Sequence, residues 1–154
     1  MNNQTTYTVR PAQQHDVGAL AAFNVAMADE TESRQLHLPT VTAGVQSLLE
    51  NAQAGFYLVA ESQGGVVGSL MVTFEWSDWR NKCFWWIQSV YVQPSHRRRG
   101  IFTRLFDEVR TMATTRNDVC GLRLYVEQHN HVAQATYKSL GMDETHYDMY
   151  EVEL

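Results

Sequence analysis

Four basic side chains and a glycine separate an alternating apolar segment from a segment with helical spacing. In "SVYVQPSHRRRGIFTRLF" (89–106), the basic residues run from His96 to Arg99, and Gly100 follows. The first backbone N–H groups of a helix have no intrahelical partner and carry partial positive charge. A glycine lets an anion approach the backbone closely, and arginines add charge-assisted donors for phosphate oxygens. The stretch therefore predicts a pyrophosphate site, with a solvated basic turn as the alternative.

Other residue types that could do chemistry are not arranged at metal-ligand spacing. Cys83 and Cys120 belong to no C-x-x-C pattern, and no cysteine or carboxylate at ligand spacing accompanies His129 and His131. We therefore predict no bound metal and two free thiols, as in cytosolic proteins. The basic turn also lacks the lysine of a P-loop and the three glycines of a dinucleotide-binding loop.

The overall composition limits the function classes. The chain has 154 residues, of which 44% are hydrophobic and 19% charged, and this suits one globular domain over residues 1–154. The net charge of -5 argues against general nucleic-acid binding, for which a basic face is typical. The sequence opens with no signal-like segment, and no apolar run approaches the roughly 18 residues of a membrane span. We therefore expect a cytoplasmic protein that binds neither nucleic acid nor a membrane.

A strand before the basic turn and a helix after it must position that turn. Bulky and β-branched residues dominate 83–92, which favours a strand, and apolar residues recur at steps of three and four in 102–112, which favours a helix. Elsewhere Asp16 and Asn130 can cap helices, and Gly141 can end one. This order of elements predicts an α/β or α+β fold in which helices pack on a sheet. The expected strands are 7–12, 55–61, 66–76, 83–92, 120–127 and 146–154, with a hairpin turn at 62–65 whose two glycines adopt positive φ, and the expected helices follow residues 16, 39, 100 and 130.

Two segments resemble motifs of one enzyme family. The stretch around the basic turn resembles the acetyl-CoA-binding motif of the GNAT superfamily of N-acetyltransferases, V-x-P-x-x-(R/Q)-x-x-G-x-(G/A), and a later segment is similar to its N-x-x-A-x-x-x-Y-x-x-x-G-F pattern. The element order also agrees, and the layout is similar to that of the spermidine/spermine acetyltransferase group. Phe102 departs from the small residue expected in the first motif, so we expect its side chain to turn away from the cofactor and into the core. The matching residues are Val92, Pro94, Arg97, Gly100 and Ile101 in the first motif, and Asn130, Ala133, Tyr137, Gly141 and Met142 in the second.

The resemblance implies a fold, an activity and a set of cofactor contacts. The implied fold is a mixed, mostly antiparallel, twisted sheet of about six to seven strands flanked by about four helices. The implied activity moves the acetyl group of acetyl-CoA, the co-substrate, to an amine by direct attack in a ternary complex, without a metal. Asn130 is implied as a cofactor contact or a helix cap, and both roles can hold. The implied cofactor-binding residues are Val90, Val92, Arg97, Arg98, Arg99, Gly100, Phe102, Thr103, Asn130 and Tyr137.

The resemblance also implies how the chemistry is divided. Tyr137 would protonate the departing sulfur, with packing of its ring on the core as the alternative. A strand bulge would free the backbone N–H of Val90 to polarise the carbonyl, and Val92 would pair with the pantetheine arm. A glutamate often precedes the V-x-P of related enzymes, but Gln88 stands here and cannot take a proton. Glu75 is therefore our preferred base, with a water chain as the alternative.

Acidic and aromatic side chains point to the acceptor. In the implied fold, the region between the first two helices helps to form the acceptor site, and residues 27–36 carry three carboxylates. Trp76, Trp79 and Trp85 lie on or beside the opposing strands. Carboxylates with aromatic rings suit a cationic amine, such as a polyamine, an amino acid or an aminoalkyl compound, although each carboxylate alone fits a solvated surface equally well. The expected substrate-binding residues are Glu30, Glu32, Glu75, Asp78 and Gln88.

Several alternatives stay open at the level of sequence. The acceptor can be a protein lysine or N-terminus, and the acyl group can be longer than acetyl. The chain can also be a non-catalytic module that binds acyl-CoA and regulates a partner. Because members of the family commonly pair through their last strands, the resemblance further implies a homodimer through residues 146–154.

Overall fold

The computed structural model describes residues 6–154. These residues form two compact units, one that ends at Leu124 and one that spans Tyr125–Leu154. Each unit is described by itself. The larger unit contains the sheet and the basic turn, and the smaller unit contains one α-helix.

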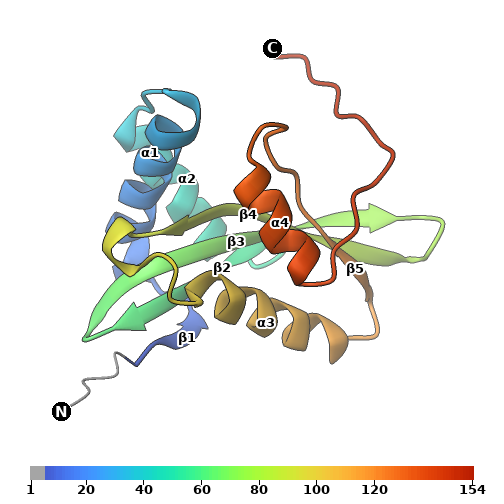
Figure 1. The fold of residues 1–154 in the computed structure, drawn as a ribbon, viewed down its shortest axis with the longest axis horizontal. Coiled ribbons are helices and arrows are strands. Elements are labelled where there is room, and N and C mark those ends of the chain that lie inside the picture. Colours follow the sequence, from blue (N-terminus) through green and yellow to red (C-terminus); the bar gives the residue numbers. More distant parts are fainter. Residues whose placement is uncertain (1–5) are drawn as a thin grey trace. The chain divides into compact units, whose positions relative to one another are not determined.

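One five-stranded sheet organises the larger unit, and its strands follow chain order across the sheet (Figure 1). The first three neighbouring pairs are antiparallel, whereas the last pair is parallel. The α+β class and the mixed, mostly antiparallel sheet are therefore confirmed, but the described residues form five strands rather than six or seven. The strands are β1 (Thr8–Pro11), β2 (Gly55–Ser62), β3 (Gly65–Ser77), β4 (Lys82–Val92) and β5 (Val119–Arg123).

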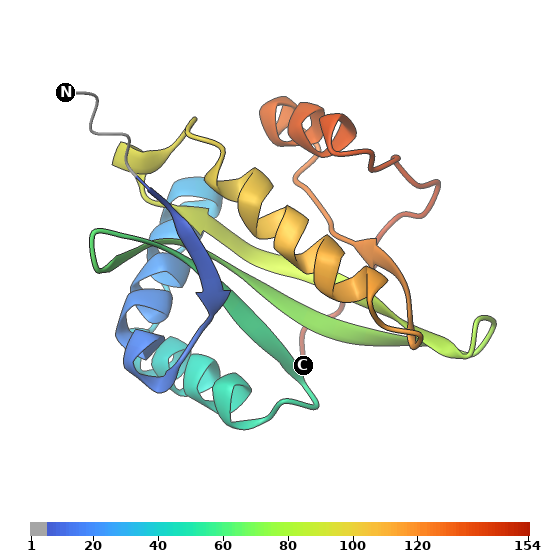
Figure 2. The same cartoon turned by 90° about the horizontal axis from the view of Figure 1, so that it is seen from below.

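Helices cover both faces of this sheet (Figures 1 and 2). α1 (Val17–Glu32) and α2 (Leu38–Glu50) pack on one face, and α3 (Ile101–Thr114) crosses the other. The helix that the apolar spacing in 102–112 favoured is present as α3, with Leu105, Phe106 and Val109 buried. Within residues 6–154, no helix combines the length and the apolar character needed to cross a membrane. The buried clusters contain Leu20, Val45, Tyr57 and Val59 on the first face, and Leu105, Phe106 and Val109 along α3.

Two local details differ from the predictions. The turn between β2 and β3 has positive φ at Gln63 and Gly64, because a two-residue turn needs it at both central positions, whereas Gly65 already begins β3. Asp16 precedes α1 but does not cap it through its side chain. The buried carboxylate of Asp16 instead accepts two hydrogen bonds from Arg10 and one from the N–H of Gln13. This ion pair fastens β1 to the start of α1.

The start of α3 packs closely on the sheet at Gly68. A Cβ atom on Gly68 would lie 3.1 Å from Cγ2 of Ile101 and 3.2 Å from the carbonyl oxygen of Tyr91. Because real Cβ atoms rarely make contacts that short, the missing side chain lets the first turn of α3 lie against β3 and β4. The position of Ile101 in turn fixes the basic turn that precedes it.

The smaller unit contains α4 (His131–Ser139) and an extended C-terminal segment. Both predicted ends of this helix are confirmed: Asn130 caps its start, and Gly141 has a φ of 84° just beyond its end. The predicted strand at 146–154 is wrong for this structure, because these residues form no strand. An alternating pattern favours a strand only when a neighbouring strand supplies hydrogen-bond partners. β5 is also shorter than expected and ends at Arg123.

Candidate active site

The predicted anion site lies between the end of β4 and the start of α3. A short 3₁₀ turn, Pro94–His96, is followed by Arg98 and Gly100 with positive φ values of 59° and 74°. A Cβ atom on Gly100 would have no heavy atom within 4 Å, so the backbone is open on that side. The first turn of α3 directs its backbone N–H groups toward this turn and carries partial positive charge. Open backbone, a helix N-terminus and nearby arginines fit a bound pyrophosphate.

Arg97 does not extend freely from this turn. Its Nε atom donates to the carbonyl oxygen of Val92 at 2.8 Å, and its Nη2 atom donates to Oε2 of Glu30 at 2.6 Å. The guanidinium also lies 5.4 Å from the centroid of the Tyr91 ring, and the Tyr91 hydroxyl donates to Oε1 of Glu30 at 3.0 Å. A predicted phosphate-binding residue and a predicted substrate-binding residue are therefore bonded to each other.

This ion pair changes the charge available at both predicted sites. The hydrogen bond from Arg97 holds the pKa of Glu30 below its usual range, and burial raises the pKa of Tyr91. Glu30 is thus ionised at neutral pH, but Arg97 balances its charge. In this structure, neither side chain offers an uncompensated charge to a ligand.

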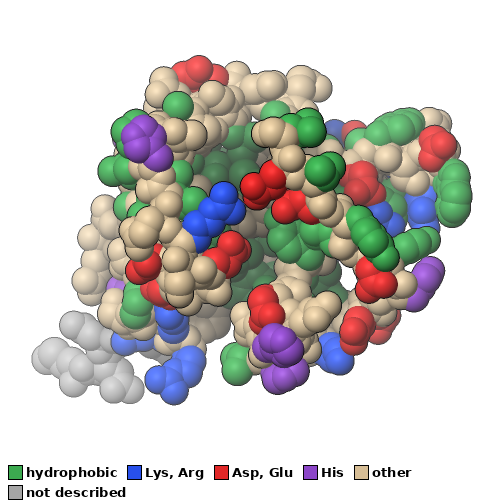
Figure 3. Space-filling view, turned by 90° about the horizontal axis from the view of Figure 1, so that it is seen from above, with side chains coloured by type: hydrophobic (Ala, Val, Ile, Leu, Met, Phe, Trp, Pro, Cys, Tyr) green, Lys and Arg blue, Asp and Glu red, His purple; other side chains and the backbone are tan. Residues whose placement is uncertain are grey.

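The other basic residues of the run, His96, Arg98 and Arg99, form no ion pair with a carboxylate in the described structure. Nη1 of Arg99 donates to the Tyr7 hydroxyl at 3.4 Å, and this hydroxyl lies 3.2 Å from Nδ1 of His96. The Arg98 side chain is exposed. Basic and acidic side chains are interspersed over the face shown in Figure 3. The basic run 96–99 thus lies in a chain whose net charge is -5.

A β-bulge lies on β4 shortly before the turn. Gln88 pairs with Met71 and Tyr91 pairs with Ser69, so two residues of β4, Ser89 and Val90, oppose one residue of β3. Ser89 has a φ of 49°, in the left-handed region. A bulge of this kind takes backbone groups out of the regular ladder. The bulge that the resemblance implied is present, at the position it implied.

Both carboxylate oxygens of Glu75 accept hydrogen bonds. Oε2 accepts from the indole N–H of Trp86 at 2.8 Å, and Oε1 accepts from the guanidinium of Arg123. Arg123 also lies 3.6 Å from the centroid of the Phe84 ring. Because Glu75 is four residues from Met71 along β3, alternation puts it on the sheet face covered by α1 and α2. Each oxygen of Glu75 keeps a second lone pair, so Glu75 can accept a proton while both hydrogen bonds persist.

The other expected substrate-binding residues are spread over three places. Gln88 donates from Nε2 to Oγ1 of Thr73, which by strand alternation shares a sheet face with Glu75. Asp78 accepts from the N–H of Trp79 at 2.9 Å in the loop between β3 and β4. Glu32 is the exposed last residue of α1. The structure therefore groups Glu75 with Gln88, while Glu30 belongs to the basic turn.

The three tryptophans expected near the acceptor site do not lie together in the structure. Trp85 is only 4% exposed, and its ring centroid lies 5.2 Å from that of Phe56 and 5.9 Å from that of Phe74. It is a core residue, and its assignment to the acceptor site is wrong. Its neighbour Trp86 points to the other face of the sheet by strand alternation, and its indole N–H donates a hydrogen bond to Glu75. Trp76 and Trp79 are exposed at the far end of the β3–β4 hairpin.

Phe102 lies on α3 with a half-buried ring, 6.2 Å from the Phe106 ring between centroids. Thr103 next to it is exposed.

The smaller unit contains two further predicted site residues, Asn130 and Tyr137. Oδ1 of Asn130 accepts a hydrogen bond from the N–H of Ala133 at 3.1 Å, so the capping role is present. Burial raises the pKa of the Tyr137 phenol, which favours the protonated form that a general acid needs.

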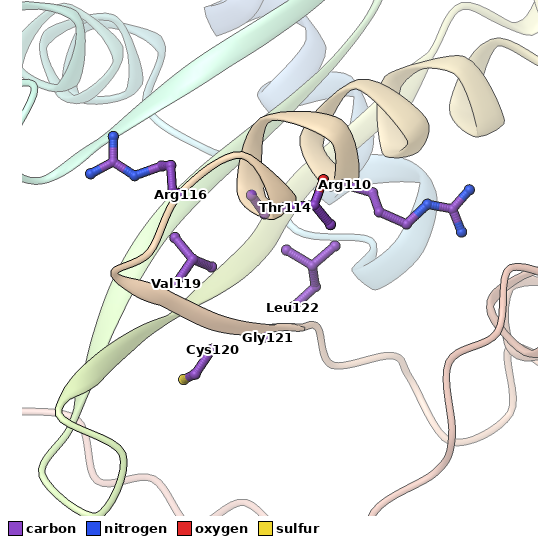
Figure 4. Close-up of a pocket in the computed structure, with 8 residues that line it drawn as sticks. Arg110, Thr114, Arg116, Val119, Cys120, Gly121 and Leu122 are labelled. Atoms are coloured by element: carbon purple, nitrogen blue, oxygen red, sulfur yellow. The ribbon is translucent and has the colours of Figure 1, made fainter.

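A cavity of about 270 Å³ lies at the other end of α3, against β5 (Figure 4). Figure 4 shows Val119 and Leu122 directed toward the helix. The two arginines that line the cavity, Arg110 and Arg116, each form an ion pair with a nearby aspartate. Because its arginines are already balanced and the basic turn lies at the opposite end of α3, the cavity is separate from the predicted anion site.

Sequence reasoning missed the partners that hold these groups, namely Tyr7, Tyr91, Trp86 and Arg123. Strand alternation puts the Arg123 side chain on the sheet face opposite Leu122 and Leu124. The sequence pattern does not, however, identify Glu75 as its partner. Both cysteines are free, as predicted. Over residues 6–154, no group of three or more His, Cys, Asp or Glu side chains could hold a metal ion.

Comparisons with known proteins agree on one family. The model of the acetyltransferase (GNAT) family matches residues 20–142. The structure of a possible acetyltransferase from Clostridium difficile 630 is 44% identical, with a TM-score of 0.90 over 96% of this chain and 97% of that one. No curated protein matched significantly.

More distant structures share the fold. A predicted acetyltransferase with acetyl-CoA from Clostridium acetobutylicum is 19% identical, with a TM-score of 0.78 over 96% of each chain. An aminoglycoside N-acetyltransferase in complex with CoA is 13% identical, with a TM-score of 0.79 over 99% of this chain and 98% of that one. At these identities, the likeness concerns the fold alone. The family match and the 44% identical structure carry the assignment: the chain belongs to the acetyltransferase (GNAT) family, and it is an acyltransferase.

Proposed function

We propose that the chain transfers the acetyl group of acetyl-CoA to a primary amine, which attacks directly within a ternary complex. The observation that carries this proposal is the bulge at Ser89 and Val90, on the strand that leads into the basic turn. The bulge frees backbone groups from the ladder, and the turn offers the N-terminus of α3 and arginines. A single stretch, 89–103, thus provides donors for a carbonyl and for a pyrophosphate.

The proposed cofactor contacts follow from this stretch. Acetyl-CoA, when bound, supplies a thioester that an amine can attack. The backbone from Gly100 to Thr103 and the side chains of Arg98 and Arg99 would hold phosphate oxygens, while Arg97 shapes the turn through the Val92 carbonyl. The proposed contacts are Val90, Val92, Arg97, Arg98, Arg99, Gly100, Phe102, Thr103, Asn130 and Tyr137.

Three groups divide the proposed chemistry. The N–H of Val90 donates where negative charge develops on the reacting oxygen. The Tyr137 hydroxyl provides the proton for the leaving sulfur, and its raised pKa supports this role. Glu75 takes the proton of the amine, directly or through water, on a carboxylate lone pair that the hydrogen bonds from Trp86 and Arg123 leave available.

We propose a small cationic amine as the acceptor, such as a polyamine, an amino acid or an aminoalkyl compound. Because Arg97 and Arg123 balance Glu30 and Glu75, a cation would rely chiefly on either Glu32 or Asp78, which lie in separate places. Gln88 would offer a neutral hydrogen-bond partner beside Glu75. The exposed rings of Trp76 and Trp79 beside Asp78 support contact with a cation. The fold shared with an aminoglycoside N-acetyltransferase fits an amine acceptor in general terms.

A thiol-release assay tests this proposal. Acetyl-CoA is offered with polyamines, amino acids, aminoalkyl compounds and lysine-containing or free N-terminal peptides, and CoA binding is measured by calorimetry. Release of CoA with a small amine, and none with the N-acetylated form of that amine, is the expected result. Turnover with peptides alone would instead assign a protein acceptor. Tight CoA binding without turnover of any amine would leave a non-catalytic acyl-CoA-binding module.

A further inference from the structure

We propose that Tyr7 is a positioning residue of the donor site, which orders His96 and Arg99 so that the Arg99 guanidinium faces a phosphate group of the cofactor. The inference rests on the proposed function, because it needs a pyrophosphate-containing donor at the basic turn. Tyr7 belongs to neither motif and has no other role in the site. Its contacts with two residues of the basic turn identify it.

Tyr7 reaches the basic turn from a distant part of the sequence. It directly precedes β1, and its side chain is only 9% exposed. Figure 2 shows β1 beginning beside the segment that joins β4 to α3. The rings of Tyr7 and His96 meet edge to face, with centroids 5.9 Å apart and an interplanar angle of 85°, and the Tyr7 hydroxyl lies 3.2 Å from Nδ1 of His96. The ring contact and the polar contact together fix the side chain of His96.

The sheet holds Tyr7 in place. Its neighbour Thr8 pairs with Glu61 of β2, and Arg10 on the same short strand donates to the carboxylates of Glu61 and Asp16. These contacts leave the backbone of β1 little freedom to move. The Tyr7 hydroxyl is therefore a fixed anchor for the exposed turn.

The hydrogen bonds run in one direction through Tyr7 when the His96 imidazole is neutral. Nη1 of Arg99 lies 3.4 Å from the Tyr7 oxygen, and a guanidinium can only donate, so this oxygen is the acceptor. The phenolic proton is then left for Nδ1 of His96, which must be unprotonated to accept it. The neutral ring consequently carries its proton on Nε2. This direction, from Arg99 through Tyr7 to His96, can be measured without a ligand.

A neutral partner distinguishes Arg99 from Arg97. The Arg97 guanidinium is bonded to Glu30 at 2.6 Å, so its charge is already balanced. In the described part of the chain, Arg99 forms no ion pair with a carboxylate, and the Tyr7 hydroxyl contacts it without cancelling its charge. Arg99 also directly precedes Gly100, where the backbone is open. An ordered arginine with uncompensated charge suits a phosphate oxygen, because less rotamer entropy is lost on binding.

Nitrogen NMR of the free protein tests the Tyr7 contact. At mildly alkaline pH, where imidazole is neutral, we expect the ring of His96 to carry its proton on Nε2 and to show a hydrogen-bonded Nδ1 signal. His96→Asn identifies that signal. In Tyr7→Phe, which keeps the aromatic ring, the Nδ1 signal should move to the position of an unbonded nitrogen or of a tautomer average.

Tyr57→Phe is the matched control for this measurement. It removes another buried phenolic hydroxyl, which is bonded to Asn24 of α1 and not to the turn. The control should leave the His96 signals in place. An unchanged His96 signal in Tyr7→Phe, or an equal change in Tyr57→Phe, would overturn the proposal.

Calorimetry with CoA tests whether Tyr7 acts through Arg99. Arg99→Gln should weaken the Kd for CoA about 10- to 100-fold, because charge-assisted hydrogen bonds to phosphate are lost. Tyr7→Phe should weaken it about 3- to 10-fold, because the arginine loses one ordering hydrogen bond. In an Arg99→Gln background, however, Tyr7→Phe should weaken it by less than about twofold. A full additional loss in that background, or an unchanged Kd in Tyr7→Phe alone, would refute the proposal.

Steady-state kinetics separates positioning from general damage. Since Arg99 would hold a part of the donor that does not react, Tyr7→Phe should raise KM for acetyl-CoA about 3- to 10-fold and change kcat by less than about twofold. A loss mainly in kcat would contradict the proposal. If CoA binds as expected but no amine is acetylated, the proposed function fails and the role of Tyr7 stands. If no CoA binds, this role of Arg99 fails together with the donor site.

Discussion

The most direct test of the donor site compares two substitutions at Gly100 that differ only in charge. Gly100→Asp places a carboxylate at the first turn of α3, and Gly100→Asn places a neutral side chain of the same shape there. Both residues visit the left-handed region more readily than other side chains, which suits the φ of 74°. A Cβ atom there meets no heavy atom within 4 Å, so neither variant should clash.

The expected difference follows from Coulomb's law. A carboxylate on the order of 5 Å from a bound phosphate, at an effective dielectric constant between about 20 and 80, repels it by about 1 to 3 kcal/mol. This corresponds to a Kd for CoA about 5- to 150-fold weaker in Gly100→Asp than in Gly100→Asn. Added salt should reduce the ratio, because the turn is exposed and its charges are screened.

Isothermal titration calorimetry with CoA at low and at higher ionic strength measures this ratio. The two variants should melt within a few degrees of each other, which shows that the comparison concerns binding. Equal Kd values at low ionic strength would refute the reasoning, because no phosphate could then lie at this turn. If both variants bind CoA weakly and with equal salt dependence, the loss of affinity would come from the added side chain at the turn and not from its charge.

Four further predictions concern catalysis, stability and assembly. Tyr137→Phe should lower kcat at least about tenfold and change Kd for CoA by less than about threefold; an unchanged kcat in the thiol-release assay would remove Tyr137 as the acid. Glu75→Gln should lower kcat and abolish the acid limb of the pH–rate profile, because an amide cannot take a proton; a retained limb would assign the base elsewhere. Burial alone would raise the pKa of Asp16, but hydrogen bonds from Arg10 and the N–H of Gln13 hold it below its usual range. Its contribution to stability is therefore complete above the unfolded pKa of about 4 and lost as pH falls below it. Asp16→Asn should cost about 2–4 kcal/mol at neutral pH and lose less stability than the wild type on acidification in urea denaturation; equal acid sensitivity would contradict this. Analytical ultracentrifugation should show a homodimer that deletion of 146–154 converts to a monomer, because this segment exposes large apolar side chains; a monomeric wild type would contradict it.

The order of elements could be predicted from the sequence because each element has a local cause. Bulky residues in 83–92, helical spacing after Gly100 and the cap at Asn130 each act within a few residues, and each is present in the structure. The strand expected at 146–154 failed for the opposite reason. A strand depends on a partner strand, and alternation in one segment does not provide one.

The site could be predicted only in part, because its side chains are paired across the fold. Glu30 and Arg97 are 67 residues apart, and Glu75 and Arg123 are 48 apart. Sequence reasoning assigned the members of the first pair to different ligands, since each side chain looked free. Which arginine reaches which carboxylate depends on how α1 and β5 lie against β4. The bulge at Val90 and the open backbone at Gly100, in contrast, were implied by the family motif.

The Glu30–Arg97 pair changes how the two proposed halves of the site are related. Glu30 lies near the end of α1, before the loop expected to face the acceptor, and Arg97 lies in the turn expected to hold the phosphates. Their ion pair joins these two regions directly, and Tyr91 contacts both members. A dianionic pyrophosphate at the turn would compete with Glu30 for Arg97, and any weakening of that bond would restore a free negative charge beside the acceptor loop. Donor binding would then prepare the protein for a cationic acceptor by redistributing one existing charge pair, without a new charged residue.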